Sequence, residues 1–496
     1  MSNAAAVAAP ATSASTSGGK SKVKYLGIFS IVMVNVAAVL SMRNFPTMAV
    51  YGWSSVTWYV LGTLLFMIPI SLIGAELATG PWDQDGGVFS WVKAGLGNKS
   101  GLIAVWCEWT ENIVWFPTVL SFLATTFVYA FNQDLANNKL YMFSTMLLVF
   151  WAVTLLNFKG VHASSKLNNF GTVFGTILPA VLLVGALAIF LFQGNASEIS
   201  FSAGAFKPDF SFGNLPFVAT VVLIFAGMEM GGYQANEMEN PQRDFPRAMF
   251  MSAIFIVAAT VVCTVAIAIV VPSKDISLAG GLMQAFDTFF EAISAGWLTP
   301  IVALLVVLGS AAQLNAWLLG PARGLSADKN GDLPPVFLRQ NENGSPVAVL
   351  VMQGILGTLF CTLFLFMPGV NSSYWILSAL TTEIFCVMYI LIFAAAIRLR
   401  KTKPIEQYPR AYTVPGGTAG MYILGGIGLF ATAFALIVGF APSDQLKNGN
   451  PVLYVVALVT GTFVLSFFPL LFKFWQKPSW KPSPGPVVPV AAGGGR

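Results

Sequence analysis

The chain has 496 residues, of which 56% are hydrophobic and 9% are charged, whereas soluble domains carry about 25% charged residues. Its mean hydropathy of +0.73 excludes a soluble enzyme or binding module and indicates a protein that crosses the membrane several times. The sequence has one histidine, and its four cysteines lie within apolar runs. We therefore expect no disulfide framework, no metal site, no cofactor and no enzyme activity, because neither a nucleophile with a base nor a set of metal ligands is apparent.

Twelve apolar runs are long enough to cross a hydrocarbon core of ~30 Å, which takes about 20 helical residues. Because the backbone must satisfy its own hydrogen bonds in lipid, these runs predict an all-α polytopic membrane protein. Numbered as spans 1 to 12, they lie near 25–45, 55–79, 101–131, 141–158, 168–193, 214–235, 247–271, 297–320, 347–368, 373–397, 420–441 and 451–473.

The regions outside the spans suggest a single transporter domain over residues 25–475. Residues 1–24 are rich in Ala, Ser and Thr, and residues 476–496 are rich in Pro, Gly and Val, so we expect both to be disordered and cytoplasmic. Two amphipathic stretches, 86–97 and 278–290, are predicted to form surface helices on the inner and outer sides.

Lysine and arginine are distributed very unevenly between the loops. If the N-terminus is cytoplasmic, the inside segments carry 21 of these residues and the outside segments carry four, while Arg43 lies within or at the end of span 1. The positive-inside rule then places both termini in the cytoplasm of a multi-pass protein of the cell inner membrane. The net charge of +5 belongs to this cytoplasmic rim, and we expect no nucleic-acid partner.

Four carboxylates fall inside the predicted spans: Glu108 and Glu111 in span 3, Glu229 in span 6 and Glu383 in span 10. An ionisable group at membrane depth costs roughly 2.5–3.5 kcal/mol, so such groups face a cavity or a partner. The alternative is a structural pair, with Arg43 or with polar neighbours. Glu108 and Glu111 share a helix face, so either a cation lies between them or one is protonated.

Span 6 contains "FAGMEMGGYQANEMENPQRDFPRAM" (225–249). Gly227, Gly231 and Gly232 allow the helix to unwind and to free backbone groups that could hold the charged ends of a substrate. The alternative is a glycine-lined packing interface. In span 1, "NVAAVLSMRNFPTMA" (35–49) predicts a discontinuity near 39–44. Spans 1 and 6 would then be the paired broken helices of a five-plus-five inverted repeat, with spans 11 and 12 additional.

These residues resemble the amino acid–polyamine–organocation transporters. The span 6 sequence is similar to an F-x-G-x-E core followed by E-x-x-N-P-x-R-x-x-P-x-A, and the resemblance covers about residues 25 to 475. Within that superfamily the chain looks closest to the bacterial glutamate/GABA antiporters. The other matching segments, in order, are "AELATGPWDQDGGVFSWV" (75–92), "GPARGLSADKNGDLPPVF" (320–337), "GSPVAVL" (344–350) and "YPRAYTVPGG" (408–417).

The resemblance implies a LeuT-like fold that binds its substrate midway across the membrane, between spans 1, 3, 6, 8 and 10. It also implies exchange of an external amino acid for an internal amine or amino acid. The residues it assigns to the unwound, substrate-binding segments are Val39, Leu40 and Ser41 in span 1 and Phe225, Ala226 and Gly227 in span 6.

The resemblance also assigns roles on other spans. Glu229 falls on the glutamate implicated in proton-linked gating in an arginine/agmatine relative, and Glu383 is a second candidate for proton coupling. Gln313 stands where the glutamate/GABA antiporter has an acid. The remaining candidates are Asn315 and Trp317, a polar and an aromatic lining residue of which Trp317 could gate the site, and Phe385 and Tyr389, which align with two tyrosines of that antiporter.

We therefore expect a secondary active amino acid transporter that works by alternating access, exchanges an amino acid for a related amine or amino acid, and is linked to protons. The surplus acids Glu108, Glu111 and Glu383 would suit a polyamine, agmatine or cationic amino acid, carried by exchange or by proton symport. A sodium symporter would need a hydroxyl and carbonyl cage, for which 308–317 offers only Ser310. A channel would need a continuous pore, whereas unlike broken helices predict an occluding carrier. A homodimer is compatible with the sequence.

Overall fold

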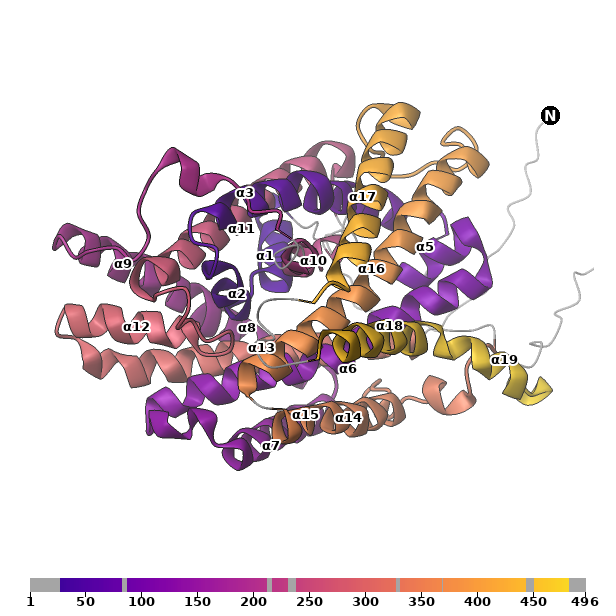
Figure 1. Cartoon of the computed structure of the whole chain (residues 1–496). Coiled ribbons are helices and arrows are strands. Elements are labelled where there is room, and N and C mark those ends of the chain that lie inside the picture. The colour runs from indigo at the N-terminus through magenta and orange to yellow at the C-terminus, as the bar shows by residue number, and fades with distance from the viewer. Residues whose placement is uncertain are drawn as a thin grey trace, which may run out of the picture.

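The computed structural model describes residues 27–82, 87–211, 216–230, 238–326, 331–367, 369–442 and 450–480, which form helices and the segments that connect them (Figure 1). Within these ranges ten helical segments are long and apolar enough to cross a membrane. A further pair is bent by 46° at a short break, and a shorter apolar helix covers Ala219–Met230. Together these segments account for the twelve predicted spans.

The helices of the spans keep the predicted order. They are α1 (Ile28–Val39) with α2 (Phe45–Ala49), α3 (Ser54–Gly62) with α4 (Ile68–Ala78), α6 (Asn98–Phe127), α7 (Lys139–Asn157), α8 (Val161–Thr172) with α9 (Leu178–Phe192), α10 (Pro216–Phe225), α11 (Pro241–Val270), α13 (Thr299–Ser326), α14 (Val347–Cys361) with α15 (Leu363–Phe366), α16 (Val370–Thr402), α17 (Gly417–Gly439) and α18 (Pro451–Phe467).

Span 1 is broken, as the sequence predicts. Helix α1 ends at Val39, and Leu40 and Ser41 adopt extended backbone conformations. The chain then turns through a short 3₁₀ segment into α2, where Pro46 occupies the first turn. Proline suits this position because its missing N–H would have no partner there. The Leu40 N–H still closes the last turn of α1 by donating to the Val36 carbonyl at 2.9 Å, and the extended backbone of Leu40 and Ser41 then interrupts the span.

Span 6, which corresponds to span 1 in the predicted inverted repeat, is also broken. Helix α10 ends at Phe225, and a turn at Ala226 and Gly227 precedes a short 3₁₀ segment. Gly227 has a φ of +98°, a left-handed conformation that glycine adopts far more readily than other residues. Gly231 and Gly232, which the sequence argument also used, lie outside the described residues.

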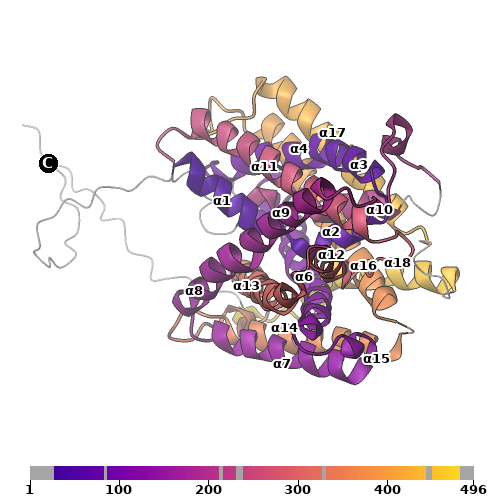
Figure 2. The ribbon, with the colours of Figure 1, turned by 90° about the vertical axis from the view of Figure 1, so that its left-hand side faces the viewer.

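The centre of the bundle is formed by α6, which packs against α13 and α16 (Figure 2). Helix α1 packs on α11, and α7 lies beside α14 at one edge in both views (Figures 1 and 2). The two amphipathic stretches form α5 (Gly87–Leu96) and α12 (Gly281–Ala292). Helix α5 is more than a surface helix, because Trp91 and Val92 are fully buried and the helix packs against both α6 and α16.

The predicted disordered ends lie mostly outside the described residues, which begin at residue 27 and end at residue 480. Residues 476–480, assigned above to the tail, are described and include a 3₁₀ turn, Pro478–Trp480. Gln476 donates a hydrogen bond of 2.7 Å to the Gly331 carbonyl.

Spans 5 and 8 cross at two glycines, Gly175 and Gly309. A Cβ on either residue would collide with the backbone of the other, which is the close approach that small residues permit between membrane helices. We expect Gly309→Val to destabilise the protein by about 1–3 kcal/mol through overpacking. The apparent Tm of the purified protein should fall, whereas Gly185→Ala, on the same span as Gly175 but with nothing within 4 Å of the new Cβ, should leave it near the wild-type value.

Candidate functional site

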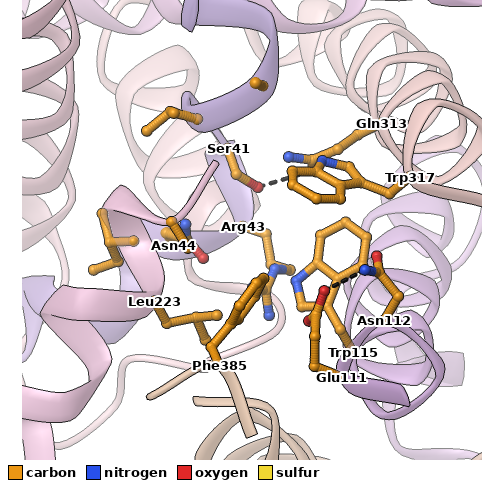
Figure 3. Close-up of a pocket in the computed structure, with 14 residues that line it drawn as sticks. Ser41, Arg43, Asn44, Glu111, Asn112, Trp115, Leu223, Gln313, Trp317 and Phe385 are labelled. Atoms are coloured by element: carbon orange, nitrogen blue, oxygen red, sulfur yellow. Dashed lines mark hydrogen bonds between the residues drawn. The ribbon is translucent and has the colours of Figure 1, made fainter. Parts of the chain in front are cut away.

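A small pocket lies where the broken segments of spans 1 and 6 meet spans 3, 8 and 10 (Figure 3). Its free volume is ≈ 30 Å³, enough for about two water molecules, so the pocket must widen before an amino acid can enter. Its walls combine apolar, aromatic, amide and charged side chains. The lining residues are Ala38, Val39, Ser41, Arg43, Asn44, Glu111, Asn112, Trp115, Leu223, Ile224, Ala226, Gln313, Trp317 and Phe385.

One side of the pocket is closed by a bond between spans 1 and 8. The Ser41 hydroxyl, in the break of span 1, donates to the Gln313 side-chain oxygen at 2.9 Å. Figure 3 shows this pair beside Trp317, above the other labelled side chains. The resemblance compares Gln313 with an acid of the glutamate/GABA antiporter. In this chain a neutral amide therefore contacts the broken helix at that position.

Arg43 lies in the pocket wall directly after the break and is 2% exposed. Its guanidinium donates to the Thr118 hydroxyl at 2.8 Å and to the Tyr374 hydroxyl at 3.2 Å, and the Tyr374 hydroxyl donates to the Arg43 carbonyl. The guanidinium also lies 5.4 Å from the centre of the Trp115 ring and 5.6 Å from that of Tyr374, within cation–π range. Spans 1, 3 and 10 thus fix this cation at one place.

Glu111 is the acid of the pocket. Its side chain accepts a hydrogen bond from the side chain of Asn112, and it lines the same pocket as Arg43. In Figure 3 the carboxylate faces the same space as Arg43, Trp115 and Phe385. Glu108 lies one turn earlier on α6, against Gly324 of α13, and does not line the pocket. The two acids thus share a helix face but not an environment.

Glu229 lies behind the pocket wall and is 3% exposed. The Tyr389 hydroxyl is 3.0 and 3.1 Å from its two carboxylate oxygens and accepts a hydrogen bond of 3.1 Å from the Gly227 backbone N–H. Tyr389 therefore connects the carboxyl of Glu229 directly to the unwound backbone of span 6. The space for Glu229 depends on Gly74 of α4, where a Cβ would approach the Glu229 Cβ to 3.1 Å.

A larger cavity of ≈ 440 Å³, here called the vestibule, adjoins the pocket and shares Ala38, Gln313 and Trp317 with it. Along α1 it extends from the pocket toward the start of the helix, as far as Val34, and along α13 it extends from Gly309 to Pro321. Trp317 touches both spaces, contacts the Trp115 ring edge-on and lies against Gly227, where a Cβ would be 3.2 Å from its ring. The other vestibule residues are Val34, Ala37, Leu40, Asn168, Asn169, Thr172, Thr176, Met230, Gly309, Ala312, Ala316, Gly320 and Pro321.

Several residues expected at the site lie elsewhere. Asn315 bonds to Asn157, Ser164 and Asn168 at the contact with spans 4 and 5. Glu383 is fully buried where Gly439 of α17 leaves room for it, and its carboxylate has no hydrogen-bond partner among the described residues. Phe225 is fully buried against Gly62 of span 2.

The comparisons with known proteins agree with this geometry. The amino acid permease family matches residues 26–464. The chain belongs to the amino acid permease family. It is 40% identical to an uncharacterised transporter of Legionella pneumophila, over 90% of this chain and 96% of the relative. It is 32% identical to a glutamate/gamma-aminobutyrate antiporter of Lactococcus lactis, over 90% of each chain.

Among solved structures, the fold of the permease resembles the crystal structure of MhsT in complex with L-phenylalanine, with a TM-score of 0.54. The two chains are 16% identical, and the match covers 84% of this chain and 99% of that chain. This likeness shows a LeuT-like fold, as expected from the broken spans. The permease is therefore an amino acid transporter rather than an enzyme, a multi-pass protein of a bacterial inner membrane that carries a small-molecule substrate.

The sequence argument gave too little weight to Arg43, Asn44 and Asn112 in this permease. Arg43 and Asn44 lie within the predicted discontinuity near 39–44, and Asn112 neighbours an intramembrane acid, so these positions were the available signal. No group of three or more potential metal ligands occurs in the part of the chain that the structure describes.

Proposed function

We propose that the permease exchanges one amino acid for a related amine or amino acid by alternating access, linked to protons, with glutamate and GABA as first candidates. The observation that carries the proposal is a pocket at two broken helices that contains both a buried cation, Arg43, and an acid, Glu111. A zwitterion needs both signs of charge. The similarity to the lactococcal antiporter supports this substrate pair.

The pocket fits diamines less well than the sequence suggested. Of the four intramembrane acids only Glu111 lines the pocket, together with Arg43. A diamine carries two positive charges, and a buried guanidinium repels them strongly because the local dielectric constant is low. The surplus of acids therefore gives weak support to agmatine, polyamines or cationic amino acids as substrates.

The vestibule is the proposed route to one side of the membrane. By the distribution of lysine and arginine, both termini face the cytoplasm, and along α1 the vestibule extends from the pocket toward that side. Trp317 separates the pocket from the vestibule, so its displacement would join the two spaces. In this mechanism the broken spans 1 and 6 rock against the central helices, and the empty carrier reorients slowly, which produces exchange.

The proton link is assigned to Glu229. A buried carboxylate needs hydrogen bonds to compensate for lost hydration, and Glu229 receives one from Tyr389, which also holds Gly227. Protonation of Glu229 would weaken the bond to Tyr389 and loosen the break of span 6. Glu383, which is buried and does not line the pocket, is the second proton-coupling candidate that the sequence analysis named.

Counterflow in proteoliposomes tests the proposed exchange. Vesicles loaded with unlabelled GABA or glutamate should take up external labelled glutamate, whereas empty vesicles and vesicles loaded with agmatine or putrescine should take up little. Equal uptake by empty vesicles, or uptake driven by agmatine alone, would overturn the substrate proposal.

The same vesicles separate the proposed exchanger from a sodium symporter. Ser310 is the sole hydroxyl residue of the sequence run 308–317, and its one oxygen supplies only one of the several ligands that a sodium cage needs. We expect uptake at fixed pH to be the same in sodium and in potassium buffers. Uptake that requires a sodium gradient would favour the symporter.

A further inference from the structure

The Arg43 guanidinium makes more contacts than it would need as a counter-charge to Glu111 alone. Its guanidinium is bonded to Thr118 and Tyr374 and lies against two aromatic rings, while its Nε has no hydrogen-bond partner among the described residues. An arginine held in this way is preorganised to receive a carboxylate, which it binds with directed, charge-assisted hydrogen bonds.

The pocket presents its two charges together at one end. Figure 3 shows Arg43 and Glu111 on the side of Trp115 and Phe385, away from the Ser41–Gln313 bond. Leu223 and Phe385 supply apolar wall at this end. A ligand with one carboxylate and one ammonium, joined by a short aliphatic chain, would satisfy both poles without leaving a charge unpaired.

The proposed exchange partners share such a fragment. Decarboxylation of glutamate releases the α-carboxylate as CO₂ and replaces it with a proton, which gives GABA. The amine and the remaining carboxylate stay in both molecules, separated by three carbons. A carrier that exchanges the two must therefore recognise this common part and tolerate the presence or absence of the α-carboxylate.

We propose that Arg43 binds the carboxylate common to both exchange partners and that Glu111 binds their common ammonium group. The α-carboxylate of glutamate then faces the unwound backbone of spans 1 and 6 and is the optional part of the ligand. This inference rests on the proposed exchange function. It makes Arg43 the residue that rejects diamines, because putrescine places a second ammonium where GABA has its carboxylate.

The test compares GABA and putrescine as competitors of labelled GABA uptake in proteoliposomes. In the wild type, GABA should compete and putrescine should not. Arg43→Gln should raise the KM for GABA about 100-fold, as expected when one partner of a buried charge pair is lost. It should also reduce the difference between GABA and putrescine as competitors of labelled GABA uptake. Arg43→Glu should reverse the preference, because two acids would then face the two ammonium groups. Arg43→Lys keeps the charge and should retain the preference for GABA with weaker binding.

Two controls separate recognition from folding. Arg398→Gln removes an exposed arginine of α16 and should change neither competitor. Thr118→Val removes one bond to Arg43 but keeps its charge, so GABA should bind more weakly while putrescine remains excluded. Monodisperse elution and an apparent Tm near the wild-type value establish that each variant is folded, and Arg43→Gln and Arg43→Lys suffice for the comparison if Arg43→Glu does not fold.

Two results would overturn different claims. If the wild type exchanges glutamate and GABA but folded Arg43→Gln keeps the wild-type KM for GABA and the wild-type ratio of GABA to putrescine competition, Arg43 has only a structural role and the exchange function stands. If the wild type exchanges neither compound in counterflow, the proposed function itself is wrong.

Discussion

Replacing Glu76 with alanine is expected to destabilise the permease by about 3–5 kcal/mol, the range found when one partner of a buried ion pair is removed. The carboxylate lies at the end of α4 and accepts hydrogen bonds from Arg400 of α16 and from Arg410 of the following loop. It also accepts a bond of 2.7 Å from the Val414 backbone N–H. The side chains of all three ion-pair residues are at most 2% exposed.

The size of the effect comes from the cations that would be left behind. Burial lowers the pKa of Arg410 and the nearby Glu76 carboxylate opposes that shift, but guanidinium groups stay protonated in proteins. Without Glu76, Arg400 and Arg410 would repel each other in a site shielded from water. The Trp82 ring, 4.8 Å from the Arg410 guanidinium, cannot replace a carboxylate because a cation–π contact is worth only about 0.5–2 kcal/mol.

The measurement is the apparent Tm of purified protein in detergent. Glu76→Ala and Glu76→Gln should both unfold at clearly lower temperature than the wild type. Glu291→Gln, an exposed acid at the end of α12, serves as the matched control and should have no effect. A Glu76→Ala protein as stable as this control would show that the cluster contributes little to the folded state.

The spans and their breaks could be predicted because they depend on local sequence. Long apolar runs must be helical in lipid, and Gly227 and Pro46 occupy positions where their special backbone properties are used. These features require no knowledge of which helices are neighbours. The LeuT-like arrangement then followed from the pairing of two unlike breaks and from the family motifs.

The lining of the site was harder to predict because it depends on the rotation of each helix. Gln313 and Asn315 are two residues apart and so point to nearly opposite sides of α13. Gln313 lines the pocket, and Asn315 bonds to spans 4 and 5. The same offset separates Phe385, in the pocket, from Glu383, which faces α17. A single sequence does not show which face of such a helix meets the cavity.

The count of acids and the lining of the pocket favour different substrates. Counting acids within the spans suggested a cationic substrate, but the structure brings Arg43 into the pocket beside Glu111 and leaves Glu229 and Glu383 outside it. Arg43 was ambiguous in sequence because a basic residue near the end of a span can extend its charged group toward the membrane surface. The break in span 1 keeps it at the pocket instead.

Replacing Glu229 with glutamine is expected to remove most of the pH dependence of exchange, whereas the wild-type rate should rise on acidification. Glutamine is neutral, as a protonated glutamate is, so the bond from Tyr389 to this position is permanently weak and the span 6 break is no longer controlled by a proton. Tyr389→Phe should act in the same direction, because it removes the only described side-chain hydroxyl that joins Glu229 to Gly227.

The exchange rate of glutamate with GABA, measured from pH 5 to 8 with equal pH on both sides, checks this expectation. Tyr454→Phe is the matched control: it removes another buried hydroxyl, which accepts a bond from Trp375 at 3.2 Å, away from the pocket. This variant should keep the wild-type profile. If Glu229→Gln also keeps it, the proton acts at another group, and Glu383 becomes the residue to test. If Glu229→Gln loses the pH dependence but Tyr389→Phe keeps the wild-type profile, Glu229 acts through a contact other than Tyr389. The Tyr389 hydroxyl would then not be needed to couple the Glu229 carboxyl to the broken helix.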